Sequence, residues 1–199
     1  MGLTLRCCVQ ILKLGLPNAR YVYTIPGAAL VAFCRKSLQG REGGTSVGAP
    51  DVPAMAAAAA SLVGTRDFAA LQSKGGRSTT VRTLYRCDVT GGAGGASLRV
   101  TAEGDGFLYN MMRILVGTLL EVGCGLRTLE ETQMLAPLAP AERAATEQEP
   151  LRPTRAMAGP TLPPFGLTLE HVEYDAVWSP QVSASINSAW TVANGADSP

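Results

Sequence analysis

The spacing of apolar and polar positions predicts four β-strands. Residues 17–33 are expected to form a strand and a turn, because YVYTI at 21–25 is rich in β-forming residues and a Pro-Gly pair follows. Two later strands flank the glycine-rich turn 91–95 and form a hairpin. In the last strand, Leu167, Leu169 and Val172 are expected on or near the buried side. The later strands are predicted at 81–90, 97–103 and 165–174.

Helical patterns separate these strands. Asp51 is a good N-cap and Pro53 suits the first turn, so a helix is expected from there to Val63, ending at Gly64. A second helix, 108–122, is apolar nearly all round and should be buried.

Two details refine this helical prediction. Gly117 lies inside the second helix and costs about 1 kcal/mol against alanine, so we expect another element to pack closely there. Thr128 followed by Glu131 is a capping box that opens a short third helix.

The order β-α-β-β-α-(α)-β predicts an α+β fold with helices on one face of a mostly antiparallel sheet. We divide the chain into a basic N-terminal segment with one strand and a Gly-rich loop (1–50) and a main domain (51–175). Within that domain, 137–159 is dense in Pro, Ala and charge and is expected to be a disordered insertion. Residues 176–199 contain one charged side chain in 24 and are expected to be a disordered tail.

Overall charge predicts neither a nucleic-acid nor a membrane partner, because 17 basic residues face 16 acidic ones. The distribution is uneven, however, since residues 1–41 hold six Lys/Arg and no acid. A basic, acid-poor start loosely suits a transit peptide, but serine is absent from the first 20 residues, so an ordinary strand region is favoured.

Cysteine and histidine add little chemistry. Five scattered cysteines form a poor disulfide framework and a poor zinc site, which favours a reducing compartment, and Cys124 is expected to be inert. The lone His171 is expected to be a surface or packing residue. The longest strongly apolar run contains Asn110 and Arg113 and is too short to cross a bilayer. No paired carboxylate, Ser/His/Asp set or phosphate loop occurs.

Arg113 is unusual because it lies in the middle of an almost wholly apolar helix. A guanidinium without a partner is costly to bury and cannot escape by deprotonation. Two interpretations remain open on these grounds. Either the side chain extends to an exposed helix edge, or it meets a carboxylate or phosphate in a cleft.

Four segments, in order, resemble the TruA family of tRNA pseudouridine synthases. Residues 106–123 (GFLYNMMRILVGTLLEVG) resemble the family's signature helix, and residues 63–71 (VGTRDFAAL) its GxxDFxSF segment. Residues 81–85 (VRTLY) are similar to its VRTIY strand, and residues 158–169 (AGPTLPPFGLTL) to its closing loop and strand. Residues 20–23 (RYVY) resemble its R-Y-x-Y strand, more weakly. The resemblance implies an antiparallel, ferredoxin- or RRM-like half of the pseudouridine synthase fold.

The resemblance covers only the second half of the family's catalytic fold. The family's G-R-T-D-x-G-V-H block, which carries the catalytic aspartate, does not occur in these 199 residues. In the family this aspartate initiates breakage of the uridine N-glycosidic bond, after which the uracil turns and reattaches through C5. That isomerisation needs no cofactor, so none is expected.

The resemblance also implies site residues. Arg113 matches the arginine that pairs with the catalytic aspartate, and an apposed arginine would keep that carboxylate ionised and aimed. Tyr21 matches the tyrosine that stacks on the target uracil and is proposed as a base, although Tyr-x-Tyr is also ordinary strand composition. Leu167 would line the uracil pocket.

Three hypotheses follow. The chain is a truncated TruA-type synthase without its nucleophile, a non-catalytic RNA-binding or partner-binding module derived from the fold, or a half-enzyme that completes a site with a separate N-terminal half. The expected partners are tRNA and either a second copy of the chain, forming a homodimer, or a complementing N-terminal half. No membrane is expected as a partner. The expected location is the cytoplasm, with an organelle or the nucleus as the alternative.

Overall fold

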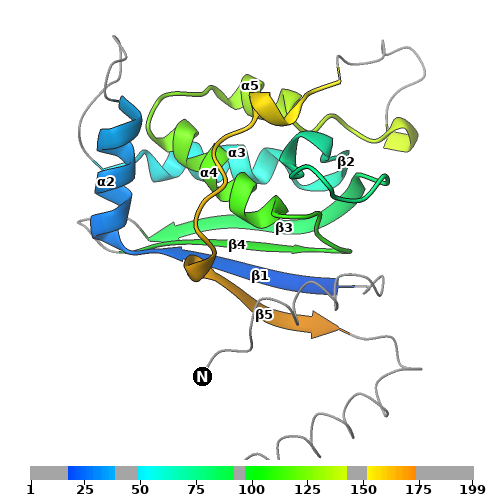
Figure 1. Ribbon diagram of the computed structural model, residues 1–199, viewed down its shortest axis with the longest axis horizontal. Coiled ribbons are helices and arrows are strands. Elements are labelled where there is room, and N and C mark those ends of the chain that lie inside the picture. Colours follow the sequence, from blue (N-terminus) through cyan, green and yellow to red (C-terminus); the bar gives the residue numbers. More distant parts are fainter. Residues whose placement is uncertain (1–17, 39–48, 92–96, 143–151, 174–199) are drawn as a thin grey trace, which may run out of the picture.

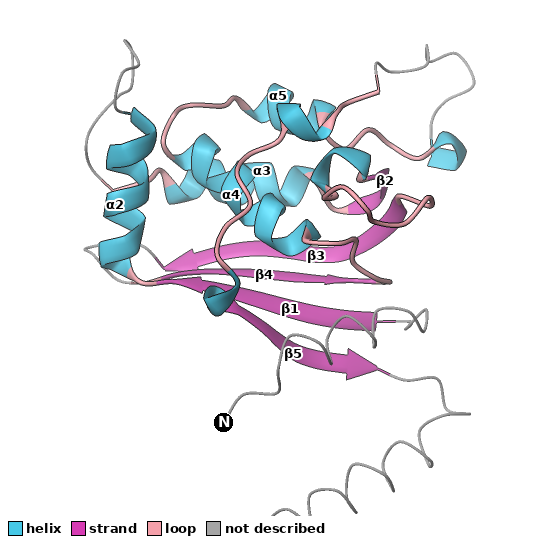
Figure 2. Cartoon of the chain, in the orientation of Figure 1, coloured by secondary structure: helices cyan, strands magenta, loops and turns pink. Residues whose placement is uncertain are grey.

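The computed structural model describes residues 18–38, 49–91, 97–142 and 152–173 as one sheet with helices on one of its faces (Figures 1 and 2). This confirms the predicted α+β class. The strands are β1 (Asn18–Ile25), β2 (Gly64–Asp67), β3 (Val81–Gly91), β4 (Leu98–Gly104) and β5 (Leu167–Glu173). The α-helices are α2 (Gly27–Leu38), α3 (Val52–Ser61), α4 (Met111–Gly123) and α5 (Leu129–Met134). The short 3-10 helices are η1 (Ala69–Leu71), η3 (Pro140–Glu142), η4 (Arg155–Met157) and η5 (Pro164–Gly166).

The sheet has the order β2-β3-β4-β1-β5, and each neighbouring pair is antiparallel. The predicted hairpin is confirmed by the pairing of β3 with β4. A bulge between β1 and β5 shifts the register, so Tyr21 opposes Leu169 while Arg20 opposes His171. This bulge explains why the half-buried residues of β5 lie at 167, 169 and 172 instead of at strictly alternate positions.

Helix α4 forms the centre of the core, as its apolar sequence predicts. All its residues except Arg113 and Glu121 are buried. The tight packing expected at Gly117 is also found, because a Cβ there would lie 2.0 Å from the carbonyl oxygen of Pro160. A Cβ on Gly159 would similarly lie 2.5 Å from the backbone nitrogen of Thr118. The two glycines therefore permit the chain at 157–163, hereafter the strap, to cross directly over α4.

The two predicted helix caps are confirmed, whereas α4 begins at Met111 instead of at the predicted Leu108. Asp51 caps α3, its Oδ1 accepting a hydrogen bond from the Ala54 N–H at 2.9 Å. At α5, the Thr128 hydroxyl accepts from the Glu131 N–H at 3.2 Å, and the Glu131 carboxylate accepts from the Thr128 N–H at 2.9 Å.

Two elements were missed by the sequence pattern. The Pro-Gly pair at 26–27 does end β1, but helix α2 begins there, and the Leu30 N–H donates to the Pro26 carbonyl at 3.0 Å. Proline fits a helix start as well as a turn, so the expected turn is wrong. Strand β2 is a four-residue edge strand whose pairing with β3 is a long-range contact that no local periodicity reveals.

The expected absence of a disulfide is wrong. Cys34 on α2 and Cys124 at the C-cap of α4 form a disulfide, with Cα atoms 5.8 Å apart. The two residues are separated by 90 positions, so their spacing gave no signal. Cys87 is a buried free thiol whose pKa is raised by burial to about 12.

Both flanks of the segment 137–159 contact the rest of the fold. The Asp67 N–H donates to the Pro137 carbonyl at 2.9 Å and the Ala139 N–H to the Thr65 carbonyl at 3.0 Å, so this flank runs along β2. The other flank contains η4 and enters the strap. Residues 143–151 lie outside the described residues, as do the basic start 1–17, loop 39–48, turn 92–96 and tail 174–199.

Candidate functional site at the N-terminal end of helix α4

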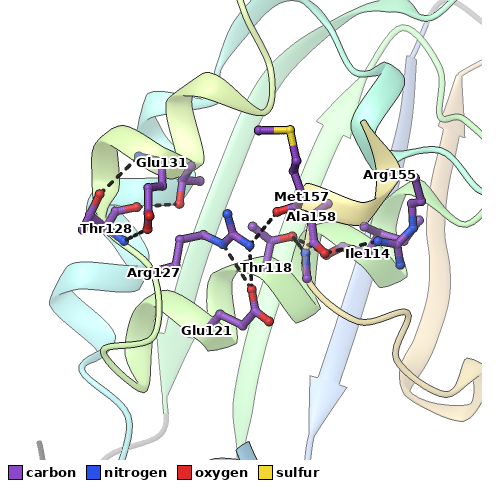
Figure 3. A network of polar contacts seen from close by, with 11 residues as sticks. Ile114, Thr118, Glu121, Arg127, Thr128, Glu131, Arg155, Met157 and Ala158 are labelled. Atoms are coloured by element: carbon purple, nitrogen blue, oxygen red, sulfur yellow. Dashed lines mark hydrogen bonds and ion pairs between the residues drawn. The ribbon is translucent and has the colours of Figure 1, made fainter. Parts of the chain in front are cut away.

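The strap connects the region after α5 to β5 and lies across α4 (Figure 1). Figure 3 shows its polar anchoring at Thr118, whose hydroxyl donates to the Ile114 carbonyl at 2.9 Å and accepts from the Gly159 N–H at 3.0 Å. Further along, the Leu162 N–H donates to the Arg113 carbonyl at 3.3 Å. The strap is therefore bonded to both halves of α4.

Arg113 emerges where α4 and the strap meet. Its Nε donates to the Leu162 carbonyl at 2.5 Å and its Nη1 to Asn110 Oδ1 at 2.8 Å. Within the described ranges, no carboxylate lies at ion-pair distance from this guanidinium, and Nη2 donates to none of these residues. The half-buried side chain is thus held by neutral oxygens, with hydrogen-bond donors left over for another acceptor.

Asn110 fixes the direction of Arg113 and was not singled out by the sequence. It precedes α4 with φ 62°, the one non-glycine residue with positive φ among those described, and its side chain does not cap the helix. Its amide instead accepts from Arg113 and donates to Ser73 Oγ at 3.0 Å. The predicted helix 108–122 included Asn110, whereas α4 begins at Met111.

Tyr21 and Leu167 lie on the helix-covered side of the sheet. The Tyr21 ring is 5% exposed and packs edge-to-face against Phe107, with ring centroids 4.8 Å apart. Leu167 is half-buried and packs against the core. Because Leu167 opposes Tyr23 across the strand pair, it is a diagonal neighbour of Tyr21. The structure therefore brings these two predicted residues together, with Tyr21 in a packing position.

Tyr23 connects the sheet to Arg113. Its hydroxyl donates to the Pro163 carbonyl at 2.6 Å, next to the carbonyl that holds Arg113. Burial raises the pKa of the Tyr23 phenol, and the positive charge of Arg113 opposes that shift. Tyr23 thus helps to fix the end of the strap at the site.

A second arginine bound to the strap lies in the turn between α4 and α5. Arg127 donates from Nε and Nη2 to Glu121 Oε2 at 3.1 and 2.9 Å, and from Nη2 to the Met157 carbonyl at 2.7 Å (Figure 3). This guanidinium has a carboxylate partner within the fold.

The aspartates near the site already have structural roles. Asp67 Oδ1 accepts from the Ala69 N–H at 3.1 Å and the Thr80 hydroxyl at 2.6 Å, and Asp105 Oδ1 accepts from the Thr83 N–H at 2.9 Å. His171 is exposed on β5. No group of three potential metal-ligating side chains occurs in the described ranges. The arrangement at Arg113 can therefore bind an anionic oxygen, and the described residues around it place no free carboxylate there to act as a nucleophile.

An apolar cavity of about 600 Å³ lies beside this site, between α2 and η5. Phe33, Leu120 and Leu162 contribute to its lining, together with Phe165, which is 89% exposed. Neither Tyr21, Leu167 nor Arg113 lines this cavity, so it is separate from the predicted uracil pocket. None of the described helices has the length and apolar character needed to cross a membrane.

The region that contains this site is similar in sequence to known proteins. Residues 58–175 match the family model described as tRNA pseudouridine synthase, a range that includes α4, the strap and β5. Over 125 residues, or 62% of the chain, it is 42% identical to tRNA pseudouridine synthase A of Anoxybacillus flavithermus and 39% identical to that of Shouchella clausii. The matches cover 44% and 42% of those two proteins, so the chain spans less than half of their length. Because the family model covers more than half of the chain, the chain belongs to the tRNA pseudouridine synthase family.

Proposed function

We propose that this chain is the C-terminal half of the catalytic domain of a TruA-type tRNA pseudouridine synthase, acting on uridine in the anticodon stem-loop of tRNA. The observation that supports this most strongly is Arg113. It lies in the family's signature helix, is aimed by two neutral oxygens, and has no carboxylate partner in the described part of the chain.

In the proposed reaction, a carboxylate from outside these 199 residues meets Arg113. The guanidinium keeps that carboxylate ionised and directs it at the ribose. The bond from C1′ to N1 breaks, the uracil turns, a bond from C1′ to C5 forms, and the proton leaves C5 while N1 gains one. The atoms balance without a cofactor, because the product is an isomer of the substrate.

Tyr21 and Leu167 are proposed to contact the target base, which must leave its stack to be reached. Tyr21 is 5% exposed in the described structure, so contact with uracil requires the ring or its neighbour Phe107 to move. In a chimera that supplies the missing G-R-T-D block, we expect Tyr21→Phe to keep the packing and to lower turnover if the hydroxyl takes part. If Tyr21 only packs the core, turnover will be unchanged.

The complementing half is proposed to dock along β5. Among the described strands, β5 is paired only with β1, and it forms one edge of the sheet. It contains Leu167 and pairs with the part of β1 that carries Tyr21. A strand supplied there would satisfy the outer backbone groups of β5 and place a carboxylate near Arg113. A homodimer is the alternative occupant of this edge.

A tritium-release assay with tRNA labelled at uridine C5 tests the proposed function. The 199 residues alone should release no tritium, since the remaining groups can position a base but cannot act as the nucleophile. A chimera joining a relative's segment that carries the G-R-T-D block to residue 18 onward should turn over repeatedly. Multiple turnovers by the chain alone, or an inactive chimera that folds and binds tRNA, would contradict the proposal.

A non-catalytic RNA-binding or partner-binding module is the second candidate, favoured by the absence of the G-R-T-D block from the sequence. An intact-mass measurement of the endogenous protein separates the two. A mass near 20.7 kDa with no associated second half supports the module. A larger chain, or a bound partner containing the block, supports the synthase.

The cytoplasm is the proposed location, with an organelle or the nucleus as the alternative. Disulfides are rare in the reducing cytosol, so a cytoplasmic location implies that Cys34 and Cys124 are reduced there. Counting alkylated thiols after rapid acid quenching of cells tests this, since an intact disulfide would favour a different compartment.

A further inference from the structure

Arg113 is aimed by two acceptors that carry no charge. Its Nη1 donates to the side-chain amide of Asn110 at 2.8 Å and its Nε to the Leu162 carbonyl at 2.5 Å. The other arginine bound to the strap, Arg127, instead donates to the Glu121 carboxylate. An aspartate has nearly the shape of an asparagine, so a carboxylate would fit in place of the Asn110 amide and would neutralise Arg113. The amide provides the same geometry and leaves the charge of the guanidinium uncompensated.

The backbone of Asn110 turns this amide away from the helix that it precedes. An ordinary N-cap residue has an extended backbone, and its side chain accepts a hydrogen bond from an N–H of the first helical turn. Asn110 instead has φ 62° and ψ 10°, and its side chain makes no such bond. Its carbonyl still accepts from the Ile114 N–H at 3.1 Å, so the helix begins normally. The amide is therefore available for contacts beside the helix.

The orientation of the amide is set by its two neighbours. A guanidinium only donates hydrogen bonds, so the amide must turn its Oδ1 toward Arg113 and its Nδ2 away from it. Ser73 Oγ lies on that other side and accepts from Nδ2 at 3.0 Å. The serine hydroxyl thus favours the one orientation of the amide that can bind Arg113.

The loop that carries Ser73 is itself held in place. The Ser73 N–H donates to the Tyr109 carbonyl at 3.0 Å, which joins this loop to the residue before Asn110. The preceding side chain, Gln72, binds the backbone of Arg77 at both atoms, since Nε2 donates to the carbonyl at 2.9 Å and Oε1 accepts from the N–H at 3.0 Å. The serine hydroxyl therefore has a defined position beside the amide.

We propose that Asn110 and Ser73 are positioning residues for the reaction. Ser73 orients the Asn110 amide, and the amide aims the Arg113 guanidinium at the incoming carboxylate without neutralising it. This role rests on the proposed function, because it requires a carboxylate from outside these 199 residues. A donor that is oriented before the reaction needs no reorganisation during it, and such preorganisation is a major source of catalytic stabilisation.

A double-mutant cycle in the 199-residue chain tests the contact between Asn110 and Arg113. Asn110→Asp places a carboxylate at this contact, keeps a residue that tolerates positive φ, and allows the Ser73 hydroxyl to donate to it. The urea midpoint should rise by about 0.5 M, because Arg113 gains a charged partner. With Arg113→Met already present, the same substitution should give no rise. Equal shifts in the two backgrounds would show that Asn110 only shapes the turn, and would overturn the proposal.

Turnover in the chimera that carries the G-R-T-D block separates positioning from folding. Asn110→Gly keeps the left-handed backbone and removes the amide. Its single-turnover rate should fall on the order of 10²-fold, as for a misplaced catalytic group, while its Kd for tRNA stays within about twofold of the wild type. Asn110→Asp should lower the rate as strongly, although it stabilises the chain, because its own carboxylate occupies the guanidinium. A residue that only supports the fold would not change stability and rate in opposite directions.

Two serine variants test the second step. Ser73→Ala should lower the single-turnover rate about fivefold, the loss expected from one hydrogen bond. The matched control is Ser61→Ala in α3, because the Ser61 hydroxyl donates to the Ala58 carbonyl at 2.8 Å, outside the chain of hydrogen bonds to Arg113. This control should leave the rate unchanged. Equal rates for the two variants would remove Ser73 from the proposal.

An unchanged rate in Asn110→Gly, or a loss confined to the Kd for tRNA, would also overturn the role of Asn110. Failure of the proposed function gives a different result, because the wild-type chimera would then fold and bind tRNA without turnover. The cycle in the 199-residue chain would still decide whether Asn110 holds an uncompensated Arg113. An active chimera with equal shifts in the cycle would keep the function and remove the positioning role.

Discussion

Two arginines bind the strap, one near the start of helix α4 and one in the turn that follows the helix, and they differ in one partner. Arg127 donates to a strap carbonyl and to the Glu121 carboxylate. Arg113 donates to a strap carbonyl and to the neutral amide of Asn110. Both guanidinium groups donate to a strap carbonyl, so the difference lies in the second partner that the chain provides.

This difference separates a structural contact, whose charges are paired within the fold, from a contact that lacks a carboxylate partner among the described residues. At Arg127, positive and negative charges compensate within the fold, and the side chains of Arg127 and Glu121 are 15% and 23% exposed. At Arg113, two oxygens set the direction of a charge that the described residues leave uncompensated. A fold that only needed to fasten its strap could use the first arrangement twice. The second arrangement is expected where a carboxylate arrives from elsewhere.

The largest expected effect concerns catalysis. In the chimera that carries the G-R-T-D block, Arg113→Met should lower turnover about 10³-fold, because the catalytic carboxylate loses the charge that orients it. Arg127→Met should leave turnover within about tenfold, as its charge is used within the fold. Tritium release under single-turnover conditions measures both. Equal losses of turnover would remove the distinction between the two arginines.

Gly117→Ala tests the strap that links the two arginines. Alanine should favour the helix by about 1 kcal/mol, yet its Cβ would overlap the Pro160 carbonyl. We expect a net loss of about 2 kcal/mol in the free energy of unfolding, within the range for overpacking. Urea denaturation measures it. A stabilised variant would show that the strap does not press on α4.

Arg127→Met should lower the free energy of unfolding by about 2 kcal/mol. Removing one partner of a fully buried pair costs about 3–5 kcal/mol, and the partial exposure of this pair reduces that loss. A double-mutant cycle with Glu121→Gln isolates the coupling between the two side chains. A coupling near zero would mean that the carboxylate contributes nothing at Arg127.

A third arginine, Arg20, forms an ion pair with Glu103, and this pair should make stability depend on pH. Hydrogen bonds from Asn18 and Arg20 hold the pKa of Glu103 below its usual value. The stability from this group is therefore present above the unfolded pKa of about 4.3 and is lost as the pH falls through the lower folded value. Glu103→Gln should flatten this part of the curve of stability against pH. An unchanged curve would show that the pair does not couple to folding.

The sequence predicted elements whose signals are local. The Asp51 cap, the Thr128 capping box and the apolar α4 are all encoded within a few residues, and the structure confirms each. Gly117 was also informative, because a glycine in a buried helix implies a close neighbour. Long-range pairings were less visible, and for that reason β2 and the Cys34–Cys124 disulfide were missed.

The residues of the candidate site were likewise predictable only where their signal is local in the sequence. Arg113 was identifiable because a charge in an apolar helix is physically costly. Asn110 was not, since its left-handed backbone and its bonds to Ser73 and Arg113 arise only when a loop 37 residues earlier folds beside α4. The roles of Tyr21 and Leu167 come from resemblance alone, and they remain predictions.

A urea melt of Arg113→Met in the 199-residue chain tests the central claim most directly. The variant loses two hydrogen bonds, worth about 1 kcal/mol each, but it also removes an uncompensated charge from a half-buried position. We therefore predict a chain that is as stable as the wild type within about 1 kcal/mol, or more stable, in contrast to Arg127→Met. A loss of about 3 kcal/mol or more would mean that Arg113 already has a charged partner within this chain, and the claim that it awaits an external carboxylate would be wrong.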